Sequence, residues 1–99
     1  MKRHRAPSPQ METLLAVLAS APREWFYGYP LMKAAGLQSG TLYPLLVRLE
    51  AKGLVESEWR EPEQPGKPPR HAYRLTSAGV ALARTVVERG SDPDGVRVP

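Results

Sequence analysis

The stretch SGTLYPLLVRLEAKGLV, residues 39–55, decides the fold of this 99-residue chain. Four leucines recur in it at the spacing of one helix face, namely Leu42, Leu45, Leu46 and Leu49. Three residues just before them are candidates for the N-cap: Ser39, Gly40 and Thr41. A start at these residues suits Pro44, because a proline costs little only in the first turn of a helix. The stretch therefore predicts a helix that ends at Lys52-Gly53, buries its leucine face and leaves the opposite face free.

Upstream of this helix the sequence predicts two more. Residues 10–21 carry apolar side chains at helical spacing, and Pro22 marks their end. After a loop, a short helix begins near Pro30 and ends near Gly36. A tight connection at Gly36 then leads into the leucine-striped helix, which is the arrangement of a helix-turn-helix.

Downstream, residues 54–60 and 71–75 alternate loosely in polarity and predict two strands. The segment between them is rich in proline and contains Gly66, so the strands form a hairpin with a stiff loop. A last helix starts at Thr76-Ser77 and stops at Gly90. The predicted order is α-α-α-β-wing-β-α. This is a mainly α fold with a small β-hairpin (α+β), typical of a winged helix-turn-helix.

The length of the chain allows one small domain. We place it at residues 10–90, between a flexible basic arm at residues 1–9 and a disordered tail at residues 91–99. Fourteen Lys and Arg against ten Asp and Glu give a net charge of +4, yet the arm holds most of this surplus. The net charge is therefore weak support for nucleic-acid binding, and the placement of individual cations matters more.

The composition excludes several classes of protein. The chain has no cysteine, which removes disulfides, thiolate metal sites and a cysteine nucleophile. Neither His4 nor His71 has a partner at metal-binding spacing, and no glycine-rich phosphate loop occurs. No stretch approaches the roughly 18 apolar residues that a membrane span needs. We therefore expect a cytoplasmic, non-enzymatic protein that has no cofactor or metal and does not bind membranes.

The free face of the leucine-striped helix carries groups suited to DNA. A helix N-terminus offers backbone donors and partial positive charge to phosphate oxygens, and hydroxyl groups add further donors. The candidate DNA-binding residues of this helix are Ser39, Gly40, Thr41, Tyr43 and Arg48. The alternative interpretation is that Ser39 and Thr41 serve only as N-caps.

The proline-rich loop and the arm supply the remaining candidates for DNA contact. Lys67 and Arg70 lie in the loop, whose restricted backbone lowers the entropy lost when they are held against a groove. The alternative is a stiff loop with solvated charges, because acidic residues stand nearby; we favour DNA contact. Arg3 and Arg5 belong to an arm that is similar in length and charge to arms that enter minor grooves.

Three stretches together resemble the PadR-like family of transcriptional regulators. They are residues 40–55, where GTLYP is followed by RLE and KGL, the YGY at residues 27–29, and residues 66–79. The resemblance implies a dimeric regulator that binds double-stranded DNA, usually a repressor that occludes a promoter and often its own. By the same resemblance, the recognition helix and the wing contact DNA through Ser39, Thr41, Tyr43, Lys67 and Arg70.

Two features depart from the pattern of that family. His71-Ala72 stands where relatives often have a basic residue and an aromatic one, so the resemblance implies one wing contact fewer in this chain. Many relatives also carry a long C-terminal helical region for dimerisation, whereas the last helix here stops near Gly90. The first and last helices must then form the dimer interface.

The apolar residues available for a homodimer interface are Leu15, Val17, Val80, Val86 and Val87. Core packing would explain each of them singly, but their number favours an interface. A two-fold dimer places its recognition helices about 34 Å apart, which matches successive major grooves. We therefore expect an inverted-repeat operator.

Three aromatic residues are candidates for an effector pocket, because relatives include sensors of aromatic compounds: Trp25, Phe26 and Trp59. We favour packing for them, since large aromatic side chains lie more often in cores or interfaces. The main alternative to a DNA-binding regulator is a winged-helix protein-interaction module without DNA contact. Salt dependence separates the two, because phosphate binding releases counterions.

Overall fold

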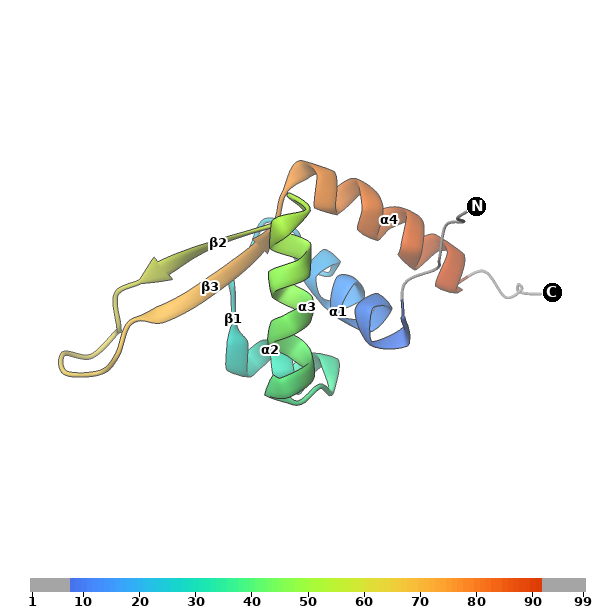
Figure 1. Ribbon diagram of the computed structural model, residues 1–99. Coiled ribbons are helices and arrows are strands. Elements are labelled where there is room, and N and C mark those ends of the chain that lie inside the picture. The colour runs from blue at the N-terminus through green and yellow to red at the C-terminus, as the bar shows by residue number, and fades with distance from the viewer. Residues whose placement is uncertain (1–7, 92–99) are drawn as a thin grey trace.

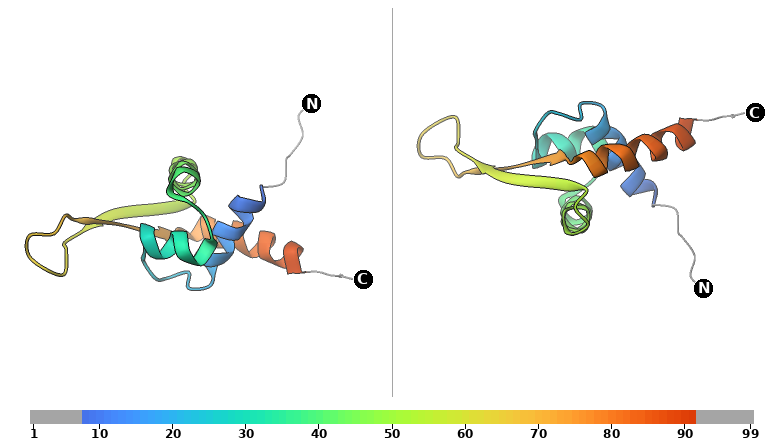
Figure 2. Two further views of the ribbon diagram at one scale, coloured as in Figure 1. Left: turned by 90° about the horizontal axis from the view of Figure 1, so that it is seen from below. Right: turned by 90° about the horizontal axis from the view of Figure 1, so that it is seen from above.

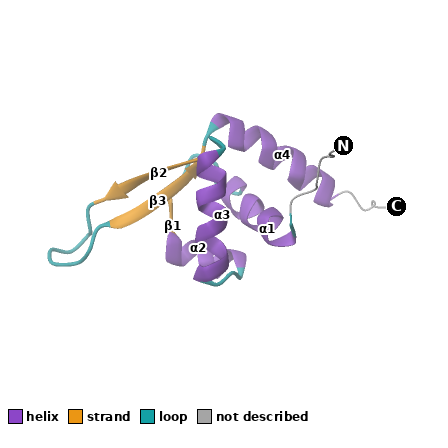
Figure 3. Cartoon of the chain, in the orientation of Figure 1, coloured by secondary structure: helices purple, strands orange, loops and turns teal. Residues whose placement is uncertain are grey.

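A computed structural model of the chain describes residues 8–91, with side chains up to residue 88 (Figure 1). Its elements, coloured by type in Figure 3, are α1 (Pro9–Ala19), β1 (Phe26–Tyr27), α2 (Gly28–Ala35), α3 (Ser39–Ala51), β2 (Val55–Arg60), β3 (Arg70–Leu75) and α4 (Ser77–Ser91). The predicted winged-helix order is confirmed, with one short strand added between the first two helices. Within this part of the chain, no helix has the length and apolar character to cross a membrane.

The four helices and one face of the sheet enclose a leucine-rich core. Helix α1 is capped by Ser8, whose hydroxyl accepts a hydrogen bond from the Met11 N–H at 3.1 Å. Helices α1 and α4 pack against each other, and α3 closes the core from one side (Figure 1). The fully buried large side chains are Leu14, Leu15, Leu18, Leu31, Leu42, Leu46, Leu49 and Val55.

The sheet has three antiparallel strands in the order β1-β3-β2. Phe26 pairs with Tyr73, and the hairpin register runs from Val55 opposite Leu75 to Arg60 opposite Arg70. Successive side chains of a strand point to opposite faces, so Val55, Ser57 and Trp59 share one face with their partners on β3. Strand β1 was expected to be loop, because two residues cannot display the alternation that identifies a strand.

The connection between α2 and α3 is tight. Helix α2 ends at Gly36, which has a φ of +67°, a conformation that only glycine adopts without strain. The N-cap of α3 is Gln38, and it makes no side-chain capping bond. The predicted cap at residues 39–41 is therefore wrong, and Pro44 lies inside the helix beyond its first turn. The proline is tolerated there because it lies on the exposed side of the helix, where water can satisfy the carbonyl group it leaves unpaired.

One junction fixes the hairpin to α4. The Thr76 hydroxyl donates to the Gly53 carbonyl at 2.7 Å and accepts from the Gly79 N–H at 3.1 Å. The Thr76 N–H donates to the Leu54 carbonyl at 3.0 Å. Gly79 is buried so closely against Leu54 that a Cβ atom there would overlap the Leu54 carbonyl oxygen. The start of β2 and the first turn of α4 are thus held together through backbone groups.

The hairpin projects away from α1 and α4, and α3 stands on one side of it (Figure 2). The exposed face of α3 and the loop of residues 61–69 therefore lie on the part of the molecule that the other helices leave open (Figures 1 and 2).

Candidate nucleic-acid interface

The first turns of α3 present polar groups to solvent. The five helix residues predicted to bind DNA are all exposed, whereas the four leucines of the same helix are buried. Among these five, Tyr43 keeps 40% of its surface exposed. The helix therefore separates a packing face from a face that is open to a partner.

The hydroxyl groups of Ser39 and Thr41 are available to a ligand. Because Gln38 occupies the cap position, neither hydroxyl caps the helix, and neither bonds to any other residue that the structure describes. The N–H groups of Ser39 and Gly40 likewise have no acceptor in residues 8–91. The capping-only interpretation is thus wrong, and these donors lie at the positive end of a 13-residue helix.

The Tyr43 ring lies against α2. A Cβ atom built on Gly28, the first residue of α2, would overlap the Tyr43 hydroxyl oxygen, so the phenol rests directly on the glycine. Gly28 is buried under it. The absence of a side chain at Gly28 therefore allows the Tyr43 hydroxyl to lie at this position.

Replacing Gly28 by alanine should weaken DNA binding about fivefold, the value of one displaced hydrogen bond, while stability changes by less than about 1 kcal/mol. The new methyl group would push the flexible end of Tyr43 aside without touching backbone. Fluorescence anisotropy with operator DNA measures the effect. In a Tyr43→Ala background the same Gly28→Ala change should have no effect on DNA affinity. An equal loss of affinity in that background would show that Gly28 does not act through Tyr43.

Two exposed apolar residues extend this surface and were missed as DNA-contact candidates. Val47 is 65% exposed and follows Tyr43 by four positions, which places both on one strip of α3. Trp59 is 68% exposed on β2, on the sheet face shared with Val55. The exposure of Val47 could have been predicted, because this residue lies outside the leucine stripe of α3. The position of Trp59 could not, because it depends on the strand register.

Trp59 is held in place by a stack on β3. Its ring stacks on His71 at a centroid distance of 4.3 Å, and the Tyr73 hydroxyl is hydrogen-bonded to His71 Nδ1 at 3.0 Å. Burial raises the pKa of Tyr73, and the nearby Tyr43 and Glu50 raise it further, so the phenol remains protonated. The Ser57 hydroxyl donates to Glu50 at 2.7 Å and ties this face to α3.

The three aromatic residues considered for an effector pocket do not come together. Trp59 lies on one sheet face, whereas Trp25 lies beneath Arg60 and Arg74 of the opposite face. The guanidinium carbons of Arg60 and Arg74 are 5.0 and 4.3 Å from the centroid of the Trp25 ring. Phe26 is half-buried against the core. These three side chains therefore do not line one shared pocket in the described part of the chain, because strand pairing places the two indoles on opposite faces of the sheet.

The loop of residues 61–69 presents its two cations differently. Lys67 is exposed, and its ammonium group has no partner in residues 8–91. Arg70 stacks on Tyr27, with the guanidinium carbon 3.6 Å from the ring centroid, and lies 3.9 Å from a Glu63 carboxylate oxygen. Arg70 is thus held at the base of the loop, whereas Lys67 is open to a ligand.

The remaining predicted residues fall into two groups. Arg3 and Arg5 lie outside the described residues. Of the interface candidates, Leu15 and Val86 are buried in the core, Val17 and Val80 are half-buried, and Val87 is 38% exposed. Leu15 and Val86 cannot supply an interface surface, because their side chains already pack between helices of the same protomer.

Comparison with known proteins agrees with this geometry. Residues 14–85 match the family described as transcriptional regulator PadR-like. The solved structure of a PadR-like transcription factor from Bacteroides fragilis is 27% identical, with a TM-score of 0.67, over 88% of this chain and 87% of that one. No curated protein gives a significant match.

Two other solved structures share the fold. The structure of smu.1704 from Streptococcus mutans UA159 is 22% identical with a TM-score of 0.74, over 97% of this chain and 98% of that one. The PcaV transcriptional regulator from Streptomyces coelicolor, solved with its natural ligand, is 25% identical with a TM-score of 0.72. The match covers 97% of this chain and 63% of PcaV.

Proposed function

The chain belongs to the PadR-like family of winged-helix transcriptional regulators, and from this premise we propose that it is a dimeric repressor of an inverted-repeat operator. The observation that carries the proposal is the exposed, uncapped start of α3, where the free donors of Ser39, Gly40 and Thr41 meet the positive helix end. Regulators of this family act on DNA and are not enzymes.

In the proposed complex, the N-terminal half of α3 enters the major groove. Ser39 and Thr41 donate to phosphates at its edge, Tyr43 reaches the sugar-phosphate backbone from its place on Gly28, and Arg48 adds a cation further along the helix. The loop of residues 61–69 then meets the adjacent minor groove with Lys67. The projection of the hairpin beside α3 supports this placement (Figure 2).

Repression follows if two protomers bind side by side over a promoter. Helices α1 and α4 are the proposed interface, with Val87 as the exposed apolar anchor. Release by a small molecule is also proposed, since PcaV, a regulator of similar fold, was solved with its natural ligand.

A mobility-shift titration against the DNA upstream of the gene tests the proposal. Binding should weaken steeply with salt, and Arg48→Ala and Lys67→Ala should each lower the slope of log affinity against log salt by about one. No shift at low salt, or a shift fully abolished by nonspecific competitor, would leave the winged-helix protein-interaction module as the function.

The dimer has its own test. Val87→Asp should raise the dissociation constant of the dimer at least about tenfold, because an aspartate carboxylate would be buried in an apolar contact. Sedimentation velocity measures this, with circular dichroism as the control for folding. Val86→Asp should instead unfold the protomer, because Val86 lies in the core. A monomeric wild-type chain would exclude the dimer.

A further inference from the structure

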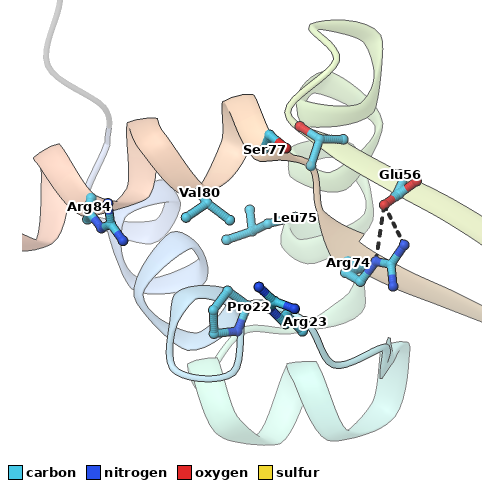
Figure 4. A pocket seen from close by; sticks show the side chains of 9 residues that line it. Pro22, Arg23, Glu56, Arg74, Leu75, Ser77, Val80 and Arg84 are labelled. Atoms are coloured by element: carbon cyan, nitrogen blue, oxygen red, sulfur yellow. Dashed lines mark hydrogen bonds and ion pairs between the residues drawn. The ribbon is translucent and has the colours of Figure 1, made fainter.

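A groove of about 540 Å³ lies where the segment after α1, the end of β3 and the start of α4 meet (Figure 4). Its lining residues are Pro22, Arg23, Glu56, Arg74, Leu75, Thr76, Ser77, Val80 and Arg84. None of them belongs to α3 or to the loop of residues 61–69. The groove is therefore separate from the proposed DNA-binding surface.

Three arginines and one glutamate make the groove strongly cationic. Arg74 is neutralised by Glu56, to which it donates two hydrogen bonds of 2.9 and 3.1 Å, and it stacks on Trp25. Arg23 and Arg84 have no ion pair, hydrogen bond or ring contact with another residue of the described part of the chain. Two uncompensated guanidinium groups, far apart in sequence, thus line one groove.

The other lining residues add an apolar surface and neutral hydrogen-bond donors to the arginines. Pro22, Leu75 and Val80 form an apolar wall between the arginines (Figure 4). Ser77 and its hydroxyl lie beside this wall at the first residue of α4, and the Ser77 N–H has no acceptor in residues 8–91. The groove therefore combines an apolar surface, two guanidinium forks and additional neutral donors.

We propose that this groove binds a phosphate monoester whose organic part covers Val80 and Leu75 and whose phosphate is reached by the long side chains of Arg23 and Arg84 from the two ends of that apolar wall. A phosphate monoester carries close to two negative charges and three free acceptor oxygens, which match two guanidinium groups and the donors of Ser77. A monocarboxylate offers one charge and two oxygens, and it would leave one arginine uncompensated. Binding here does not depend on the DNA interaction proposed above.

Calorimetric titration of the full chain with phenyl phosphate, in a low-salt buffer free of phosphate, tests the site. Arg23→Gln and Arg84→Gln should each weaken binding about tenfold, the value of charge-assisted hydrogen bonds to one guanidinium. Lys33→Gln removes one exposed charge from α2, outside the groove, and should leave the affinity unchanged. Amide chemical shifts should change at Ser77 and Val80.

The choice of probes separates the contributions of charge and apolar surface. Benzoate, with the same ring and a single charge, should bind at least about tenfold more weakly than phenyl phosphate. Inorganic phosphate should also bind more weakly, because it cannot cover the apolar wall. Equal binding of inorganic phosphate would overturn the role assigned to that wall. Absence of binding up to about 10 mM phenyl phosphate, or an equal loss in Lys33→Gln, would overturn the site itself.

Discussion

Replacing Thr41 by glutamate should weaken operator binding at least about 100-fold without weakening the fold. Thr41 is exposed in the first turn of α3, where a carboxylate would face the DNA phosphates in the proposed complex. Like charges held together at an interface cost several kcal/mol. The same carboxylate interacts favourably with the positive end of the helix, so the free energy of unfolding should stay level or rise by up to about 1 kcal/mol.

Because Thr41→Glu should weaken operator binding without lowering stability, the test distinguishes a lost DNA contact from a damaged fold. Anisotropy titration with operator DNA measures the affinity, and urea unfolding followed by circular dichroism measures the stability. Gln10→Glu is a matched control, because it places the same charge in the first turn of α1, away from α3. It should leave operator affinity within about threefold. An equal loss in both variants would mean that net charge, rather than a contact at Thr41, controls binding.

The sequence predicted the helices well because their apolar spacing is a direct consequence of burial. The leucines of α3 recur at the helical period, and all four are buried. The cap was misplaced because Gln38 is a weak capping residue by preference, and its extended backbone follows from the turn at Gly36. Residue preference alone cannot locate a cap that is set by the geometry of a neighbouring turn.

The parts of the site that could not be predicted from the sequence are those that depend on pairing between segments. Whether Trp25 and Trp59 share a face is decided by the register that places Trp59 opposite His71. A shift of one residue would reverse the face of every side chain in the strand. In the same way, helical spacing marks Leu15 and Val86 as apolar-face residues but does not say whether the partner helix belongs to the same protomer.

The opposite sheet face explains how a thin hairpin can hold a DNA-binding loop in a fixed position. Arg70 stacks on Tyr27, while the guanidinium groups of Arg60 and Arg74 both lie over the Trp25 ring. These contacts join both hairpin strands to β1 and the residue before it, so the hairpin base is braced from the side away from Trp59. The pattern is not visible in the sequence, because the aromatic residues lie more than thirty positions from the arginines they contact.

Replacing Gly79 by alanine should lower the free energy of unfolding by about 2–3 kcal/mol, although alanine is the better helix former. Gly79 lies in the first turn of α4, and its missing side chain lets the helix approach the Leu54 backbone. An added methyl group would overlap the Leu54 carbonyl oxygen and press on the Leu75 side chain at 3.0 Å. Since the oxygen belongs to the backbone, α4 itself would have to move, and the hydrogen bonds of Thr76 to Gly53 and Leu54 would be strained.

Gly40 provides the matched comparison, because it is also helical but a Cβ atom there meets nothing within 4 Å. Gly40→Ala should raise the free energy of unfolding by about 0.5 kcal/mol, the value of helix propensity near a helix end. Urea denaturation of both variants shows whether each substitution raises or lowers the free energy of unfolding. A stabilised Gly79→Ala variant would show that α4 and β2 do not meet as closely as the structure places them. Opposite signs would confirm that this backbone contact, rather than helix propensity, joins the hairpin to the helical core.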